Sequence, residues 1–266
     1  MKRNYSNAPL EKLRAKSAFL CDMDGVIYHG GTVIPGAAEF IDWLKKENKK
    51  YLFLTNGSGK SPRELSEKLA RMGLDVSEEH FFTSAQATAS FLAGQCPGGS
   101  VYAIGEPGLL NALYDAGFSM NSHDPDFVVF GKTTNLSYAE IERAVLLVQR
   151  GAGLIGTNSD VTDPGENGIV PACRALISPI EMTTGRKAYY IGKPNPLMMR
   201  HALKQLDVSR RDAAIIGDRM DTDIIAGIEN EMDTVLVLSG VSTMETVGEF
   251  AYRPKYILED VGKIAP

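Results

Sequence analysis

Short runs of consecutive apolar and β-branched residues recur along the chain, separated by longer segments in which apolar residues repeat every three or four positions. The runs are apolar throughout and do not alternate with polar residues. This pattern is typical of strands buried on both faces of a parallel sheet. The strands predicted in this way are 18–23, 51–55, 101–105, 127–130, 154–157, 189–192, 213–217 and 234–238.

Several of the intervening segments begin with residues that favour the first turn of a helix. The segments 61–64 and 137–140 each place a serine three residues before a glutamate, which is the capping-box pattern, and 195–196 places an asparagine before a proline. Gly151 stands where a glycine commonly ends a helix. The alternation of strands and helices predicts an α/β fold with a doubly wound parallel-sheet (Rossmann-like) core.

Two carboxylates follow the first predicted strand. Asp22 and Asp24 stand two positions apart, and Gly25 then permits a turn. Ligands bind to open α/β sheets outside the carboxyl ends of the strands, so both acids are expected to face a crevice. Because aspartate and glycine are also common turn residues, the motif taken alone indicates a simple turn equally well.

The second predicted strand also ends in polar residues. Thr55, Asn56 and Gly57 bring together a hydroxyl, an amide and exposed backbone N–H groups, which suit the binding of an oxyanion. A capped turn uses the same residue types and is the commoner interpretation of this segment in isolation.

Lys193 and Asp218 stand at the ends of two later predicted strands. Lys193 precedes a proline-initiated helix, where its ammonium group can neutralise a phosphate, although most lysines are simply solvated. Asp218 and the nearby Asp223 supply carboxylate oxygens, which are ligands suited to Mg²⁺. The alternative is a charged loop in which Thr222 caps the next helix.

The four polar strand ends are predicted to converge on one edge of one sheet. Unrelated turns would not be expected to assemble such a set, and in this order it resembles the motifs of the haloacid dehalogenase-like superfamily. The resemblance extends over roughly residues 17–260 and is closer still to the NagD-like subfamily. The segments that carry the subfamily resemblance are 22–26, 35–37, 54–56, 82–85, 157–160, 184–186, 192–194 and 238–242.

The resemblance implies a phosphatase mechanism. Asp22 would be the nucleophile that forms an aspartyl-phosphate, and Asp24 would act first as general acid and then as general base. Mg²⁺ would be held by the Asp22 carboxylate, the backbone carbonyl of Asp24 and Asp218. Asp223 would not bind the metal itself but would orient metal-bound water or Lys193. The residues expected to bind the phosphate oxygens are Thr55, Asn56, Gly57 and Lys193.

The resemblance also implies a domain inserted between the second and third polar strand ends. Residues 86–187 contain their own predicted strands and helices and would form an α/β cap domain, with 1–85 and 188–266 as a discontinuous core. Such a cap excludes water and selects the substrate. Asn158 and Asp160 are candidates for a cap loop that reaches the substrate, and an Asx turn inside the cap is the equal alternative.

The expected function is therefore hydrolysis of small phosphate monoesters. The NagD-like resemblance implies nucleoside monophosphates such as UMP, with sugar, glycerol or phosphoglycolate-type phosphates as the alternative. The rival from another class is a signalling module that accepts a phosphoryl group without releasing it. Such modules are about half this length and have no insertion between the hydroxyl and the lysine. A binding protein that kept the fold is disfavoured because the acids and the lysine are all present.

Composition and charge limit the classes of partner that this protein is expected to bind. A formal net charge of -5 at 266 residues provides no basic footprint for nucleic acid, and no run approaches the ~20 apolar residues of a membrane span. The N-terminal segment lacks the uninterrupted apolar run of a signal peptide. The three cysteines are widely spaced, which favours reduced thiols. The sequence thus predicts a cytoplasmic enzyme acting on a small phosphorylated metabolite, and it indicates no oligomeric state.

Overall fold

The computed structural model describes residues 8–165 and 168–266, which form two compact units. The first unit contains the described residues up to Thr55, together with Ser66–Phe82 and Met199–Pro266. The second unit contains Asn56–Leu65 and Thr83–Met198. The predicted division into 1–85 with 188–266 and 86–187 differs from these contact-defined units at its edges, and it stays a prediction about where a cap domain begins and ends.

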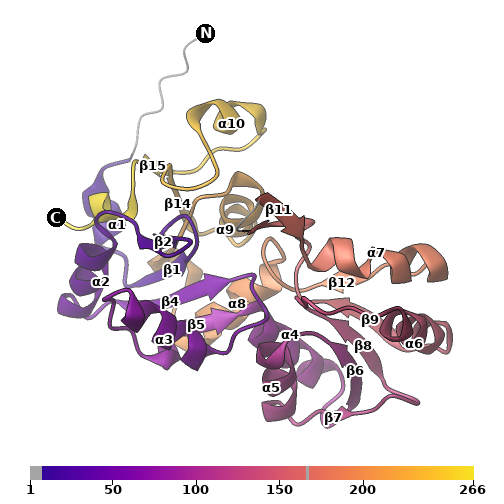
Figure 1. Ribbon diagram of the computed structural model, residues 1–266. Coiled ribbons are helices and arrows are strands. Elements are labelled where there is room, and N and C mark those ends of the chain that lie inside the picture. The colour runs from indigo at the N-terminus through magenta and orange to yellow at the C-terminus, as the bar shows by residue number, and fades with distance from the viewer. Residues whose placement is uncertain (1–7, 166–167) are drawn as a thin grey trace. The chain divides into compact units, whose positions relative to one another are not determined.

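The first unit is built on a six-stranded sheet with the order β15-β14-β13-β1-β4-β5 (Figure 1). The central strand β1 pairs in parallel with β4 on one side and β13 on the other, and β14 and β15 continue in parallel beyond β13. The chain therefore winds outward from β1 in both directions, which creates a switch point between β1 and β13. The strands are β1 (Ala18–Asp22), β4 (Lys50–Thr55), β5 (Phe81–Thr83), β13 (Ala213–Gly217), β14 (Asp233–Val237) and β15 (Tyr256–Leu258), with a separate hairpin of β2 (Tyr28–His29) and β3 (Thr32–Val33).

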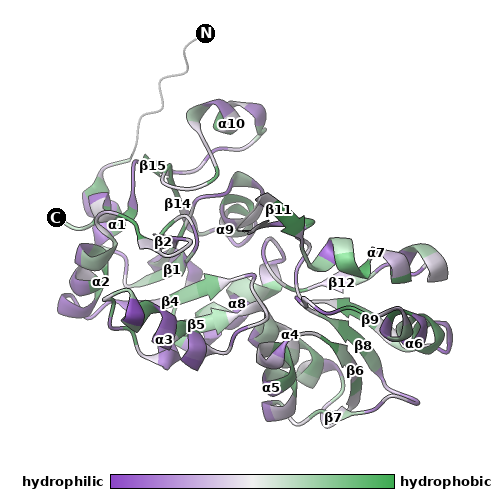
Figure 2. Ribbon diagram, in the orientation of Figure 1, coloured by the Kyte–Doolittle hydropathy of each residue, from purple (hydrophilic) through white to green (hydrophobic). Residues whose placement is uncertain are grey.

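Helices flank this sheet and bury its apolar residues. Phe19, in the middle of β1, is fully buried and packs edge-on against Phe40 and Trp43 of α2, with ring centroids 6.2 and 5.5 Å apart. Figure 2 shows the strands mostly in the colours of apolar residues. The helical segments are α1 (Leu10–Arg14), α2 (Ala37–Lys46), α9 (Ile225–Glu229), α10 (Met244–Glu249), the short η1 (Glu78–His80), η2 (Arg210–Asp212) and η4 (Val261–Ile264), and the single-turn π-helix η3 (Met220–Ile224).

The second unit has its own parallel sheet, ordered β12-β9-β8-β6-β7 (Figure 1). Its core holds Val128, Phe130 and Leu154 of the sheet against Leu147 of α6 and Ile177 of α7. The elements are α4 (Ser84–Gln95), β6 (Ser100–Ile104), α5 (Pro107–Asp115), β7 (Ser119–Met120), β8 (Phe127–Phe130), α6 (Tyr138–Gln149), β9 (Gly153–Gly156), the hairpin β10 (Thr162–Gly165) and β11 (Gly168–Pro171), α7 (Cys173–Thr184) and β12 (Tyr189–Tyr190). Helices α3 (Pro62–Arg71) and α8 (Pro196–Leu206) each have residues in both units.

The predicted fold class is confirmed, and each predicted strand has a counterpart. The predicted helix starts are also found. In α6 the backbone N–H of Glu140 donates to Ser137 Oγ at 3.2 Å, and the backbone N–H of Ser137 donates to Glu140 Oε2 at 2.8 Å. The pattern missed β5, β7, β15 and the two hairpins, because strands of two to four residues are too short to show a period.

One prediction about the sheets is wrong. The run 189–192 was expected to end at the same sheet edge as the acids, but its strand, β12, pairs with β9 in the second sheet. The run consists of two tyrosines, an isoleucine and a glycine, a composition that suits a strand of either sheet and does not distinguish the two partners. Lys193 therefore follows a strand of the second unit and not of the first.

Candidate active site

Three carboxylates meet at the carboxyl edge of the first sheet. Asp22 is the last residue of β1, Asp218 directly follows the neighbouring strand β13, and Asp223 lies in η3 just beyond it. Adjacent parallel strands end at the same edge, which brings these distant residues together. One carboxylate oxygen from each residue lies within 4.8 Å of the other two.

The chemistry of this acid cluster fits a hard divalent cation. Asp218 and Asp223 are 2% and 1% exposed, so their charges have little access to water. Carboxylates crowded in this way repel one another, and a bound cation relieves the repulsion. Oxygen donors alone suit Mg²⁺, which usually takes one or two protein carboxylates and keeps several waters. The Asp223 carboxylate is part of this cluster, and its expected role of orienting metal-bound water or Lys193 stays a prediction.

The loop after β14 encloses the Asp218 carboxylate. The backbone N–H of Val241 donates to Asp218 Oδ2 at 2.7 Å, and that of Ser242 donates to the Asp218 carbonyl at 3.1 Å. A Cβ on Gly240 would lie 2.0 Å from Asp218 Oδ2, and one on Gly25, whose φ is +80°, would lie 2.4 Å from it. Two glycines are therefore needed for backbone to approach this carboxylate so closely. Sequence reasoning noted 238–242 only as part of a resemblance and gave it no role.

Asp24 lies outside the acid cluster. Its side chain is about half exposed, and its Oδ1 lies 3.5 Å from Nδ1 of His29, in the β2–β3 hairpin. Of Asp22 and Asp24, only Asp22 contributes a carboxylate to the cluster. The sequence analysis did not find the proximity of His29 to Asp24.

Asn56 is the centre of a second polar group, which lies entirely in the second unit. Its side-chain Nδ2 donates to the Lys193 carbonyl and to Asp160 Oδ2, both at 2.9 Å. Its carbonyl accepts hydrogen bonds from Asn158 Nδ2 and Ser84 Oγ, both at 2.7 Å. The structure therefore joins two predicted phosphate-binding residues to the two predicted cap-loop residues.

The remaining predicted residues adjoin these groups. Thr55 ends β4, next to β1 in the first sheet, and is partly buried, while Gly57 is exposed. Lys193 is only 3% exposed and so is not an ordinary solvated lysine. The Asx-turn alternative for 158–160 is observed, since the backbone N–H of Asp160 donates to Asn158 Oδ1 at 3.1 Å.

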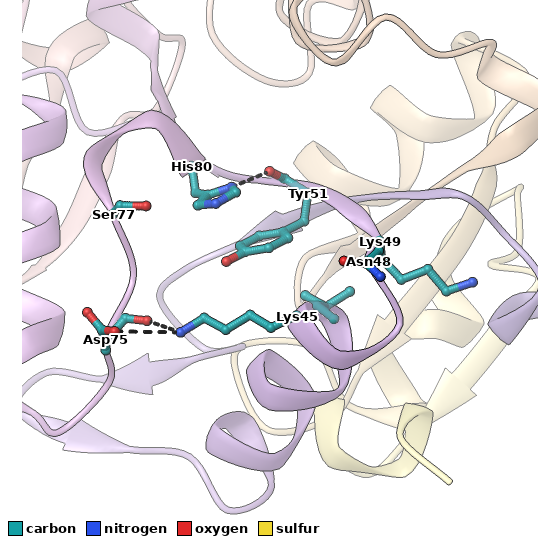
Figure 3. Close-up of a pocket in the computed structure, with 8 residues that line it drawn as sticks. Lys45, Asn48, Lys49, Tyr51, Asp75, Ser77 and His80 are labelled. Carbon is teal, nitrogen blue, oxygen red and sulfur yellow. Dashed lines mark hydrogen bonds and ion pairs between the residues drawn. The ribbon is translucent and has the colours of Figure 1, made fainter.

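A hollow of about 490 Å³ in the first unit lies away from the acid cluster. Figure 3 shows Tyr51 stacked on His80 in its wall, with ring centroids 3.9 Å apart. Burial, followed by the carboxylates of Glu79 and Asp75, raises the pKa of Tyr51 to about 12. Tyr51 is near the amino end of β4 and Thr55 is its last residue, a separation of roughly 13 Å along a strand. The hollow is therefore at the opposite end of the strand from the acids.

The chain is similar to known phosphatases over almost its whole length. Residues 19–119 match the family described as haloacid dehalogenase-like hydrolase, and residues 190–264 match one described as HAD-hydrolase-like. Dihydroxyacetone phosphatase of Corynebacterium glutamicum is 42% identical over 93% of this chain and 90% of its own length. The chain belongs to the haloacid dehalogenase-like hydrolases.

Two further relatives refine the position of this hydrolase. Acid sugar phosphatase of Staphylococcus saprophyticus is 40% identical over 93% of this chain and 96% of its own. Ribonucleotide monophosphatase NagD of Escherichia coli is 38% identical over 92% of this chain and 96% of its own. The solved NagD structure matches with a TM-score of 0.89 at 37% identity, covering 94% of this chain and 98% of that one. The predicted NagD-like subfamily is confirmed.

The predicted enzyme class is confirmed with the family: this hydrolase is a phosphoric monoester hydrolase acting on small phosphorylated compounds. The rival interpretation as a phospho-accepting signalling module is thereby disfavoured. Among the described residues, no helix is long and apolar enough to cross a membrane. Cys21, Cys96 and Cys173 form no disulfide bond within the part of the chain that the structure describes.

Proposed function

We propose that this hydrolase is a Mg²⁺-dependent phosphatase that cleaves small phosphate monoesters through a phospho-aspartyl intermediate on Asp22. The observation that carries the proposal is the convergence of Asp22, Asp218 and Asp223 within 4.8 Å at the carboxyl edge of the sheet. Family membership supplies the reaction class, and the cluster supplies an oxygen-only site for the metal.

Asp22 attacks phosphorus in line with the leaving oxygen, and a bond from its carboxylate oxygen to phosphorus replaces the ester P–O bond. Asp24 donates a proton to that leaving oxygen and then accepts one from the water that hydrolyses the aspartyl-phosphate. The exposed position of the Asp24 side chain supports this role, because a proton donor has to reach both substrate and water. When bound, Mg²⁺ offsets negative charge on the transferring phosphoryl group.

Asp22 and Asp218 hold the metal by their carboxylates, and the Asp24 backbone carbonyl completes the predicted ligand set. Asp223 lies close enough to the other acids to be either a direct ligand or a partner of metal-bound water. Thr55, the backbone of Asn56 and Gly57, and the Lys193 ammonium bind the phosphoryl oxygens, which provides the electrostatic stabilisation that dominates phosphoryl transfer. The buried position of Lys193 supports a functional role for its charge.

The proposed substrates are small phosphate monoesters, with a nucleoside monophosphate such as UMP first among them. The NagD-like resemblance supports UMP. The names of the Corynebacterium and Staphylococcus relatives support short sugar and triose phosphates as the second candidate. These relatives differ from this chain to similar degrees, so a direct comparison of substrates is required.

The test is phosphate release by the purified protein from p-nitrophenyl phosphate, UMP, dihydroxyacetone phosphate, glycerol phosphate and phosphoglycolate. We expect sustained turnover with Mg²⁺, its loss with a chelator and its return when Mg²⁺ is restored. Asp22→Asn should abolish all of these activities. Phosphorylation that stops after a single equivalent would identify a phospho-acceptor instead, and turnover that persists in Asp22→Asn would exclude Asp22 as the nucleophile.

A further inference from the structure

The side chain of Asn56 forms hydrogen bonds with two segments that are distant from it in sequence. Its Nδ2 donates to the carbonyl of Lys193, 137 positions away, and to Oδ2 of Asp160, 104 positions away. A side-chain amide carries two N–H donors, so both are engaged inside this network. The amide nitrogen of Asn56 therefore stabilises the local structure and has no N–H left to donate to a phosphate.

The backbone of Asn56 is held from the other side. Its carbonyl accepts hydrogen bonds from Asn158 Nδ2 and from Ser84 Oγ, which are 5% and 0% exposed as residues. A carbonyl oxygen has two lone pairs, and both are used. The hydrogen bonds fix the peptide plane of Asn56, and with it the direction of the backbone around 56–57.

The backbone at Gly192 packs closely against the amide oxygen of Asn56. A Cβ on Gly192 would lie 2.6 Å from Asn56 Oδ1, so the backbone preceding Lys193 passes directly over the amide oxygen. Gly192 is itself tied to the end of β9, because its N–H donates to the Thr157 carbonyl at 2.8 Å. Asn56 thus contacts both of the chain segments that follow β9 and β12.

Asp160 is also anchored through its backbone. Its backbone N–H donates to Asn158 Oδ1 at 3.1 Å, and its carbonyl accepts from the Arg174 N–H at 3.0 Å, at the start of α7. A carboxylate held in this way is a strong and well-directed acceptor for the Asn56 amide. A chain of hydrogen bonds thus connects the start of α7 to Asp160, Asp160 to Asn56, and Asn56 to the backbone of Lys193.

We propose that Asp160 is a positioning residue which, through Asn56, holds the backbone of Asn56 and Lys193 in the geometry that binds the phosphoryl group. The inference rests on the proposed function, since it takes Asn56 and Lys193 as phosphate-binding residues. It replaces direct substrate contact as the role of Asp160. Displacement of a binding group by even a fraction of an ångström weakens a preorganised site.

The test compares Asp160→Ala with Asp160→Asn, and uses Ser159→Ala as the neighbouring control. Asparagine keeps an oxygen that accepts from Asn56, whereas alanine removes the acceptor. The measurements are inhibition of p-nitrophenyl phosphate hydrolysis by inorganic phosphate, and Mg²⁺ binding by calorimetry. For Asp160→Ala we expect the inhibition constant of phosphate to rise about tenfold, as loss of a charge-assisted hydrogen bond predicts. The inhibition constant of Asp160→Asn should stay within about threefold of the wild-type value. That of Ser159→Ala should equal the wild-type value.

Mg²⁺ affinity should be unchanged in all three variants, because the acid cluster belongs to the other unit. Equal damage from Asp160→Asn and Asp160→Ala would overturn the proposal, since the charge itself would then be what matters. Weakened Mg²⁺ binding, or unchanged phosphate inhibition in Asp160→Ala, would overturn it as well. If Asp160→Ala does not fold, Asp160→Val also removes the acceptor and is read in the same way. A wild type without turnover would mark failure of the proposed function, whereas an active wild type with an unaltered alanine variant marks failure of this inference alone.

Discussion

Gly240 lies against the carboxylate of Asp218 so closely that a Cβ on it would stand 2.0 Å from Oδ2. The adjacent Val241 N–H donates to the same oxygen at 2.7 Å. The loop after β14 therefore fixes which way Asp218 faces, although it contributes no acid to the cluster. Mutation of a group that orients a metal ligand commonly lowers the affinity for the metal by roughly tenfold to a hundredfold.

Gly240→Ala is expected to weaken Mg²⁺ binding by roughly tenfold to a hundredfold, because the new methyl group displaces the Asp218 carboxylate. Isothermal titration calorimetry measures the affinity directly. Gly248→Ala is the matched control, since a Cβ there meets nothing within 4 Å and its affinity should equal that of the wild type. An unchanged affinity in Gly240→Ala would mean that Asp218 is not a metal ligand.

Asp223→Asn is expected to raise the thermal stability of the metal-free protein and to reduce the further stabilisation that Mg²⁺ provides. Removing one charge relieves repulsion among three crowded carboxylates but also weakens the attraction for the ion. Melting temperatures with and without Mg²⁺ test both effects. Asp221→Asn is the control, because that carboxylate pairs with Arg219 at 2.8 Å and is outside the cluster. Asp223 would have no part in the metal site if its variant behaved like this control.

Asp24→Asn is expected to lower kcat by about 10² to 10⁴ on UMP and by much less on p-nitrophenyl phosphate. An alkyl oxygen needs a proton to leave, whereas p-nitrophenolate leaves readily without one. Steady-state kinetics on the two substrates measure the difference, with Asp22→Asn as the variant that should lose both activities. Equal losses on both substrates would argue against Asp24 as the general acid.

The carboxylate of Glu64 is expected to titrate below its ordinary pKa. The backbone N–H of Ser61 and then its hydroxyl donate to Glu64 Oε2, both at 2.8 Å, and hold the pKa of that carboxyl down. A depressed folded-state pKa adds stability above the unfolded pKa, and this stability is lost as pH falls through the folded value.

Ser61→Ala removes the hydroxyl donor, so the Glu64 pKa should move back toward its ordinary value and the acid dependence of stability should weaken. A carbon-detected NMR titration of the Glu64 carboxyl reads the pKa directly. Ser178→Ala, whose hydroxyl bonds to the Ala175 carbonyl elsewhere, should leave the Glu64 pKa unchanged. If Ser61→Ala also leaves it unchanged, the Ser61 hydroxyl does not bind Glu64 in solution.

Much of the fold was predictable because the features that define it are local. The apolar runs mark the strands of both sheets, and a serine three residues before a glutamate marks the start of α6. The acids at 22 and 218 were also predictable, since the ends of adjacent parallel strands meet whatever lies between them in sequence. The very short strands were missed because too few residues carry the pattern.

The amino-acid sequence by itself determined the longer strands, several helix starts and the acids at the strand ends, because near neighbours and residue type set these, and the resemblance of its motifs to a known family indicated the reaction class. Only the tertiary structure decided that Tyr189–Tyr190 pairs with β9 and that Gly240 lies against Asp218. It also decided that the Asn56 amide donates its hydrogen bonds to Asp160 and Lys193. The physical reason is that strand partners and hydrogen-bond partners are chosen by packing among segments far apart in the chain. An apolar run or an asparagine is compatible with several partners until the other segments are in place.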